Sequence, residues 1–228
     1  MGRDASATRE RLIEAGTRLF AEHGIDAVRV REINTEAGQR NSSALHYHFG
    51  SREGLLQAIL AEHREPMERY RTELLDALER EGRTDDLRAL VATMVLPLMA
   101  ELSTESGRAY LRIIPQYIGR YSPSFSKLPK SYGPDGIRRT VALSVACLGH
   151  LPDDERETRV DLTMEYVTYA VARRARDIDE GVPLRLPEER FVSAVLDLAV
   201  GGLGSAVTFD APPGHLPAGV TGRHPSTD

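Results

Sequence analysis

Apolar residues recur at intervals of three and four along most of the chain, and this period constrains the fold more than any other feature of the sequence. In the segment that begins at Ser51, for example, Leu55, Leu56, Ile59 and Leu60 fall on one side of a helix. No segment shows a convincing alternation of apolar and polar residues, which is the pattern of a half-buried strand. The period therefore predicts an all-α fold with about nine helices.

Capping residues, glycines and prolines divide this pattern into helical segments. Pro66, Pro97 and Pro115 fall inside three of them, and we expect each proline to kink or interrupt its helix. The stretch 121–136 is rich in proline, serine and glycine and is predicted to be a long loop. The helices are predicted over residues 8–23, 30–37, 42–48, 51–78, 85–102, 106–121, 137–148, 153–175 and 187–199.

The charge balance excludes a protein that coats nucleic acid through bulk positive charge. The chain has 29 basic and 34 acidic residues and a net charge of −5, so any contact with nucleic acid must come from a local patch. Basic residues are concentrated between Arg29 and Arg52, where four arginines accompany two glutamates. This region is therefore the first candidate for such a patch.

The sequence carries no pattern of secretion or of membrane insertion. Cys147 is the single cysteine, which excludes an intramolecular disulfide framework and a cysteine-rich zinc site. No apolar run approaches the length of a membrane span, and the amino end lacks the apolar core of a secretory signal. We expect a cytoplasmic protein that does not contact a membrane.

The first fifty residues have the pattern of a small DNA-reading unit. Three short helices are predicted there, with a tight turn at Gly38 between the second and the third. A helix that enters the major groove needs a small apolar core behind it and short polar side chains toward the base edges. Ile33, Ala37, Leu45 and Phe49 are suited to form that core.

Several residues of this region stand in a specific order: Val30 and Ile33, then Ala37-Gly38, then Tyr47-His48-Phe49, and finally Arg52 with Leu55-Leu56. In this order they resemble the signature of the TetR family of bacterial transcriptional regulators, over roughly residues 8–60. The resemblance implies a helix-turn-helix DNA-binding domain over residues 1–50 and a helical ligand-binding and dimerisation domain over residues 51–209. Residues 210–228, rich in proline, glycine and threonine, are predicted to be a flexible tail.

The resemblance also implies which residues contact DNA. Arg29, Tyr47, His48 and Arg52 would hold the phosphate backbone, and the residues near base edges would be Arg31, Ser42, Ser43, Ala44 and His46. His48 is equally suited to packing between helices, and Arg31 is also suited to an ordinary solvated surface. One residue more than is usual separates Ala37-Gly38 from Tyr47, and this leaves the set of base-contacting residues open. The candidates for DNA contact are Arg29, Arg31, Arg40, Asn41, Ser42, Ser43, Ala44, His46, Tyr47, His48 and Arg52.

A single helix-turn-helix unit binds DNA weakly, so a homodimer on a palindromic operator of double-stranded DNA is expected. Candidate residues for the dimer interface are Val167, Val171, Leu196, Ala199 and Leu203, with the alternative that this stripe faces the core of the monomer. By analogy with the family, the middle helices would bind a small-molecule effector. Candidate lining residues are Met94, Met99, Tyr110, Tyr117 and Tyr121, with ordinary core packing as the alternative.

Patterns that would indicate an enzyme are weak or missing. A Gly-x-Ser-x-Gly elbow is missing, and the glycine-rich stretch 199–206 follows a predicted helix rather than a strand. His46 and His48 are two apart on a predicted helix, where they diverge, so they do not indicate a metal site. We expect no enzymatic reaction, cofactor or metal. The expected function is a sequence-specific transcriptional regulator, a ligand-responsive repressor, with an activator or a helical protein-interaction module of the same fold as alternatives.

Overall fold

A computed structural model of the protein describes residues 2–39, 41, 43–121 and 135–207. Within these ranges the chain forms nine α-helices, one short 3-10 helix and no strand, which confirms the predicted all-α fold. The elements are α1 (Gly2–His23), α2 (Val30–Glu36), α3 (Ala44–Phe49), α4 (Arg52–Arg80), α5 (Leu87–Ala100), η1 (Glu101–Ser103), α6 (Glu105–Tyr121), α7 (Asp135–Cys147), α8 (Asp153–Asp179) and α9 (Glu188–Gly204). The predicted tail 210–228 and most of the predicted loop 121–136 lie outside the described residues.

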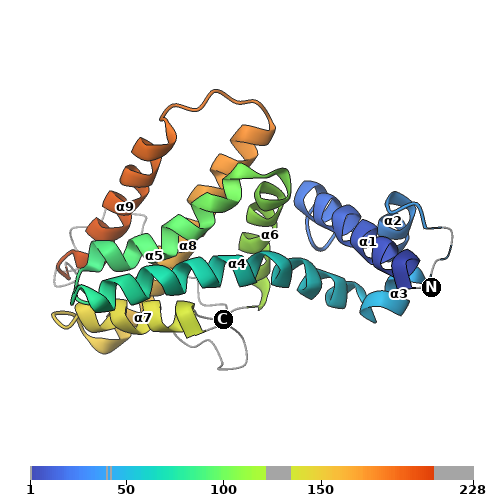
Figure 1. Ribbon diagram of the computed structural model, residues 1–228. Helices are drawn as coiled ribbons and strands as arrows, with labels where there is room; N and C mark the ends of the chain where they lie inside the picture. Colours follow the sequence, from blue (N-terminus) through green and yellow to red (C-terminus); the bar gives the residue numbers. More distant parts are fainter. Residues whose placement is uncertain (1, 40, 42, 122–134, 208–228) are drawn as a thin grey trace, which may run out of the picture.

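The helices form a small amino-terminal unit and a larger body that share one long helix (Figure 1). α1, α2 and α3 lie together at one end, and α4 begins directly beside α3. α4 then runs into the body, where it packs against α5 and α7. The predicted helix-turn-helix unit is thus connected to the rest of the protein through α4, a helix of 29 residues, and α1 also packs against α6.

One apolar core continues from the small unit into the body. Leu12 and Phe20 of α1 are fully buried, as are Leu55 and Ile59 of α4. Gly16 brings these two helices close together, because a Cβ at this position would lie 2.8 Å from Cδ2 of Leu55. Burial of each large apolar side chain contributes about 1.5–3 kcal/mol. This contact therefore fixes the direction in which α4 leaves the small unit.

The prolines do not divide the helices as predicted. α4 continues through Pro66 for another fourteen residues to Arg80, and α6 continues through Pro115 to Tyr121. α5 also passes Pro97 and ends at Ala100, where η1 follows. A proline inside a helix removes one hydrogen bond and crowds the preceding turn. The apolar contacts along these helices outweigh that local cost.

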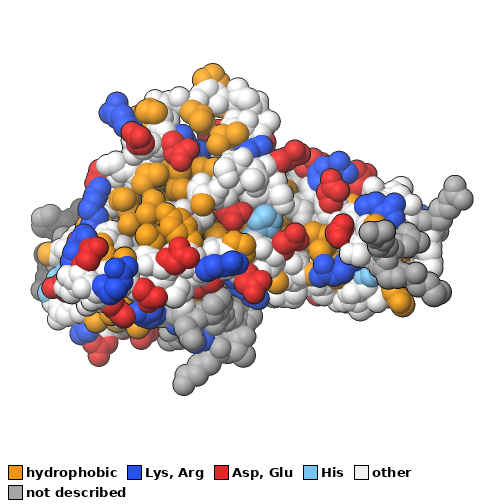
Figure 2. Space-filling view, in the orientation of Figure 1, with side chains coloured by type: hydrophobic (Ala, Val, Ile, Leu, Met, Phe, Trp, Pro, Cys, Tyr) orange, Lys and Arg blue, Asp and Glu red, His pale blue; other side chains and the backbone are white. Residues whose placement is uncertain are grey.

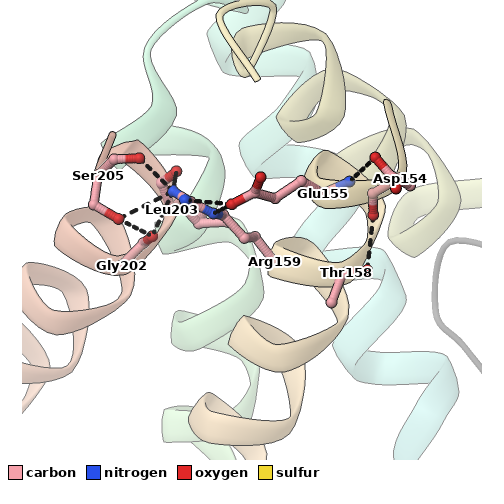
Figure 3. A network of polar contacts seen from close by, with 7 residues as sticks. All are labelled: Asp154, Glu155, Thr158, Arg159, Gly202, Leu203 and Ser205. Atoms are coloured by element: carbon pink, nitrogen blue, oxygen red, sulfur yellow. Dashed lines mark hydrogen bonds and ion pairs between the residues drawn. The ribbon is translucent and has the colours of Figure 1, made fainter. Parts of the chain in front are cut away.

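Helices α8 and α9 form an antiparallel pair on the outside of the body. Near the start of α8, the guanidinium of Arg159 donates to the carbonyl oxygen of Ser205 and to two carbonyls in the last turn of α9 (Figure 3). Glu155 orients this arginine by accepting from Nη2 at 2.7 Å. At the other end of α8, Arg174 lies over the ring of Phe191, 4.4 Å from its centroid. The positive charge of Arg159 also stabilises the carboxyl end of α9.

The surface of the body is partly apolar. Figure 2 shows hydrophobic side chains gathered over the region where α5, α8 and α9 meet, with charged residues around them.

Among the described helices, none combines the length and hydropathy that crossing a bilayer requires.

Candidate nucleic-acid interface

A buried amide holds the second and third helices together. Oδ1 of Asn34 accepts the backbone N–H of Leu45 at 3.3 Å, and only 4% of Asn34 is exposed. Ile33 and Leu45 are fully buried in the core beneath the two helices. Because an unpaired buried polar group costs about 1–3 kcal/mol, this bond fixes how α3 sits on α2. This role of Asn34 was not predicted from the sequence. The signal available there was a short polar side chain between the apolar positions Ile33 and Ala37.

The turn between α2 and α3 is tight and requires a glycine. Gly38 has a φ of +65°, in the left-handed region that side chains disfavour. Its N–H donates to the carbonyl of Thr35 at 3.0 Å, and the N–H of Gln39 donates to that of Asn34 at 2.8 Å. This pair of bonds is the Schellman arrangement that ends a helix. Asn41 then accepts the N–H of Ser43 on Oδ1 at 2.9 Å, which leads the chain into α3.

The outer side of α3 exposes three polar side chains. Ser43 and His46 are exposed, and Tyr47 is 82% exposed, the largest fraction among the large apolar or aromatic side chains of the described surface. Nδ1 of His46 lies 2.9 Å from the carbonyl oxygen of Gly50. A carbonyl only accepts, so Nδ1 carries a proton, and in the neutral ring Nε2 is an acceptor. The predicted DNA-facing residues Ser43, His46 and Tyr47 therefore lie where a base edge or phosphate can reach them.

His48 is half-buried, and its position agrees with the packing alternative as well as with a contact at the edge of the interface. Its ring meets that of Tyr47 edge to face, with centroids 5.0 Å apart, and lies 6.2 Å from that of Phe49. The ring of Phe49 in turn lies beneath the guanidinium of Arg9 from α1, at 5.3 Å. Arg9 is exposed and was not predicted from the sequence, because only the fold brings α1 to the end of α3.

The side chain of Ala44 is placed differently from the prediction. Ala44 is 8% exposed and belongs to the apolar core, so it cannot reach a base edge. The reason is that the first turn of α3 packs both Ala44 and Leu45 against the core. Arg31 of α2 and Arg29, which precedes α2, are exposed, while Arg40 and Ser42 lie outside the described residues.

Arg52 is turned away from the predicted phosphate contact. Its Nη1 donates to the carbonyl oxygen of Ile25 and, at 3.4 Å, to that of Val28. The guanidinium also lies 6.0 Å from the ring centroid of Phe20, and 18% of the side chain is exposed. Arg52 thus ties the start of α4 to the turn between α1 and α2. The carboxylate of Glu53 accepts from Nε and Nη2 of the same guanidinium. In this structure the donors of Arg52 are thus engaged within the chain, and its contact with phosphate stays a prediction.

The predicted effector residues are buried in the body. Met94, Met99, Tyr110 and Tyr117 are each at most 8% exposed, and the side chain of Tyr121 lies outside the described residues. Nε2 of Gln57 donates to the hydroxyl of Tyr117 at 3.1 Å, across α4 and α6. A cleft of about 710 Å³ lies between α1, α6 and the end of α8, and a second one of about 330 Å³ lies beside the segment 182–186. Neither is lined by the predicted residues.

The predicted dimer residues also lie inside the body, as the alternative interpretation held. All five are at most 9% exposed and belong to the core of one chain, so their side chains cannot form the contact with a partner. The apolar stripe is buried because α5 and α6 cover the inner sides of α8 and α9. These residues are Val167, Val171, Leu196, Ala199 and Leu203.

Similar solved structures include three proteins with low sequence identity. The fatty acid degradation regulator FadR from Bacillus halodurans is 16% identical over 85% of this chain and 98% of that one, with a TM-score of 0.48. A TetR-family transcriptional regulator from Rhodococcus sp. is 19% identical over 88% and 100%, with a TM-score of 0.46. A gamma-butyrolactone receptor described as ArpA-like is 21% identical over 86% and 98%, with a TM-score of 0.45. These values are too low to indicate a ligand or an assembly.

The amino-terminal unit itself gives a specific match. Residues 12–59 fit the family model of bacterial regulatory proteins of the tetR family, and this range contains most of α1, all of α2 and α3, and the start of α4. No curated protein matches the sequence well enough to count as a relative. Residues 12–59 therefore form a helix-turn-helix DNA-binding unit of the TetR family.

Proposed function

We propose that this regulator is a ligand-responsive repressor that binds a palindromic operator as a homodimer. The observation that carries the proposal is the construction of α3, which buries Ala44 and Leu45 and exposes Ser43, His46 and Tyr47. A short helix that is anchored on one side and polar on the other is what a reader of the major groove requires.

The exposed residues divide into two roles. Ser43 and Nε2 of the exposed His46 are suited to hydrogen bonds with base edges, which specify sequence. Tyr47 of α3 and Arg31 of α2 are also exposed. Arg9 joins this surface from α1, where the ring of Phe49 orients its guanidinium for a phosphate oxygen. Arg29 contributes a further exposed positive charge at the start of α2.

Fluorescence anisotropy with operator fragments tests the DNA interface. Tyr47→Ala is expected to weaken binding about 5- to 150-fold, which corresponds to roughly 1–3 kcal/mol for one specific contact. Tyr70→Ala is the matched control, because Tyr70 is a tyrosine on α4 that is also exposed, at 37%. Arg9→Ala should reduce the slope of log affinity against log salt by about 0.9 for each phosphate lost. Equal affinities for Tyr47→Ala and Tyr70→Ala would contradict this interface.

The homodimer is proposed to form through the outward faces of α8 and α9. Leu162 and Tyr169 of α8 are 58% and 60% exposed, and Leu198 of α9 is 65% exposed. The spacing of seven places Leu162 and Tyr169 on one side of α8. An exposed apolar surface of this kind on a soluble domain indicates a contact with another protein surface. The antiparallel pair held by Arg159 gives that surface a fixed shape.

Light scattering after size-exclusion chromatography tests the dimer. The wild-type protein is expected at twice the chain mass of 25.2 kDa. Leu198→Glu is expected at the mass of a single chain. Leu184→Glu is the matched control, because Leu184 is an exposed leucine in the segment between α8 and α9. A wild-type protein that stays monomeric in the presence of its operator would refute the dimer.

The response to a ligand is proposed to act through α4. This helix is packed into the body and is tied to the small unit by Arg52 and by the contact of Gly16 with Leu55. A shift of α4 would change the distance between the two copies of α3 in a dimer. A ligand has this effect only if it binds one of the two conformations, which differ in this distance, more tightly than the other. Operator affinity measured across fractions of a metabolite extract should change with at least one fraction, and no change with any fraction would contradict the proposal.

A further inference from the structure

Three polar side chains from α4, η1 and α6 form one chain of hydrogen bonds. His63 of α4 places Nδ1 2.7 Å from Oε2 of Glu101 and Nε2 3.1 Å from Oγ of Ser106. The imidazole stacks on the ring of Tyr110, with centroids 4.7 Å apart. Only 13% of each of the His63 and Glu101 side chains is exposed. Packing and hydrogen bonds therefore hold the imidazole in one orientation.

The partners determine the direction of these bonds. The carboxylate of Glu101 only accepts, so Nδ1 of His63 donates and Nε2 of the neutral ring accepts the proton of the Ser106 hydroxyl. A serine hydroxyl on an imidazole that a carboxylate orients is the arrangement that activates serine as a nucleophile. Glu101 and Ser106 lie 38 and 43 residues from His63 in the sequence, so no short motif marks the cluster.

Ser106 also lines the cleft of about 710 Å³ between α1, α6 and α8, which is large enough for a small molecule. Two arginines of this cleft, Arg108 and Arg112, both pair with Asp179, at 2.5 and 3.5 Å. Carboxylates outnumber guanidinium groups in the lining, so an uncharged ligand is favoured over an anion. The acidic lining residues are Glu14, Glu22, Glu105, Asp179 and Glu180, and the basic ones are Arg18, Arg108 and Arg112.

The position of Ser106 in α6 supplies donors for a developing negative charge. Ser106 lies in the first turn, where backbone N–H groups have no partner within the helix. The N–H of Gly107 donates to Oγ1 of Thr104 at 3.0 Å. The N–H groups of Glu105 and Ser106 precede it in the same turn and are suited to stabilise an oxyanion beside Ser106.

We propose that Ser106, His63 and Glu101 form a hydrolytic site for small uncharged carboxylic esters, separate from the DNA interface. Nε2 of His63 takes the hydroxyl proton while Oγ of Ser106 bonds to the carbonyl carbon of the ester. The ester C–O bond then breaks, the departing alcohol takes that proton, and the acyl group stays on Ser106. Water gives a proton to the same imidazole, adds to the acyl carbon and releases the carboxylic acid, and the proton returns to Ser106.

Hydrolysis of p-nitrophenyl acetate and p-nitrophenyl butyrate by the full-length protein tests the site. Ser106→Ala and His63→Gln are each expected to lower kcat/KM by roughly 10²-fold, the size of effect that loss of acid–base assistance produces. Ser103→Ala is the matched control, because Ser103 is an exposed serine in η1 whose hydroxyl donates to the carbonyl of Ala100 at 2.8 Å. A fluorophosphonate probe is expected to label Ser106.

The outcomes are distinguishable from a loss of fold or of DNA binding. Ser106 is exposed, so Ser106→Ala should keep the thermal stability and the operator affinity of the wild type. A wild-type rate no higher than that of Ser106→Ala, or a probe that labels another residue or none, would overturn the hydrolytic site. Neither result bears on the proposed repressor, which is measured by its affinity for DNA.

Glu101 is a positioning residue in this scheme, because it touches the imidazole and not the ester. Glu101→Gln should lower kcat with little change in KM, since the substrate cleft is intact while the imidazolium loses its counter-charge. Glu101→Asp, which keeps the charge, should recover part of kcat. A kcat for Glu101→Gln equal to that of the wild type would show that Glu101 does not position the base.

Discussion

Replacing Arg52 by methionine separates a structural role from a DNA-binding role. In the structure the guanidinium donates to the carbonyls of Ile25 and Val28, and methionine removes both bonds while keeping much of the side-chain volume. A hydrogen bond from a charged donor contributes about 1.5–3 kcal/mol. The bond to Val28 is long and 18% of the side chain is exposed, so we expect a total loss of about 2 kcal/mol. For a chain of this length, that lowers Tm by about 4–8 °C.

The assay pairs thermal unfolding with the salt dependence of non-specific DNA binding. Arg52→Met should lower Tm and leave the slope of log affinity against log salt unchanged, because backbone carbonyls and Glu53 already accept from the guanidinium. Arg31→Met is the matched control with the opposite expectation. Arg31 is exposed on α2, so its loss should leave Tm unchanged and reduce the slope by about 0.9. An unchanged Tm with a reduced slope for Arg52→Met would refute the structural role.

Three further predictions concern the body. Arg71→Met should lower the free energy of unfolding by about 3–5 kcal/mol in denaturant titrations, because it leaves Glu68 buried without its ion-pair partner. A loss below about 1 kcal/mol would argue against a buried pair. Asp86→Ala should lower the free energy of unfolding by about 1 kcal/mol in the same assay, because Oδ1 of Asp86 accepts an N–H in the first turn of α5 and caps that helix. An unchanged free energy of unfolding would show that the cap is unimportant. Leu162→Glu should weaken dimerisation without lowering Tm in dilute solution, and an unchanged dissociation constant in sedimentation experiments would place the interface elsewhere.

The helical pattern of the sequence located every described helix, because a buried face requires an apolar residue every three or four positions. The same pattern could not show which element covers that face. Val167 and Leu203 lie on an apolar helix face, and the sequence was compatible with burial of that face either against a second chain or in the core of the same chain. The structure shows that the monomer core covers them, so the outward residues Leu162 and Leu198 remain for a partner.

The candidate site shows a similar division. Order and spacing were sufficient to identify the helix-turn-helix unit and the exposed Tyr47 and His46 of its third helix. They were insufficient to predict the contacts of the Arg52 and Arg9 side chains, because the direction of a long side chain depends on acceptors and rings from elements distant in the sequence. Arg52 finds its acceptors in the turn after α1, and Arg9 lies over the ring of Phe49. The hydrogen-bonded cluster around His63 likewise arises from three segments that only the fold brings together.

Selection of bound fragments from random genomic DNA by the purified protein tests the central claim most directly. The account predicts strong enrichment of fragments with two inverted half-sites, separated by one helical turn of DNA or a multiple of it. His46→Ala, which removes a proposed base-edge contact, should change which sequences are enriched, and Tyr70→Ala should leave them unchanged. Recovery of fragments in the same proportions as the input, at low ionic strength and with a folded protein, would contradict the account.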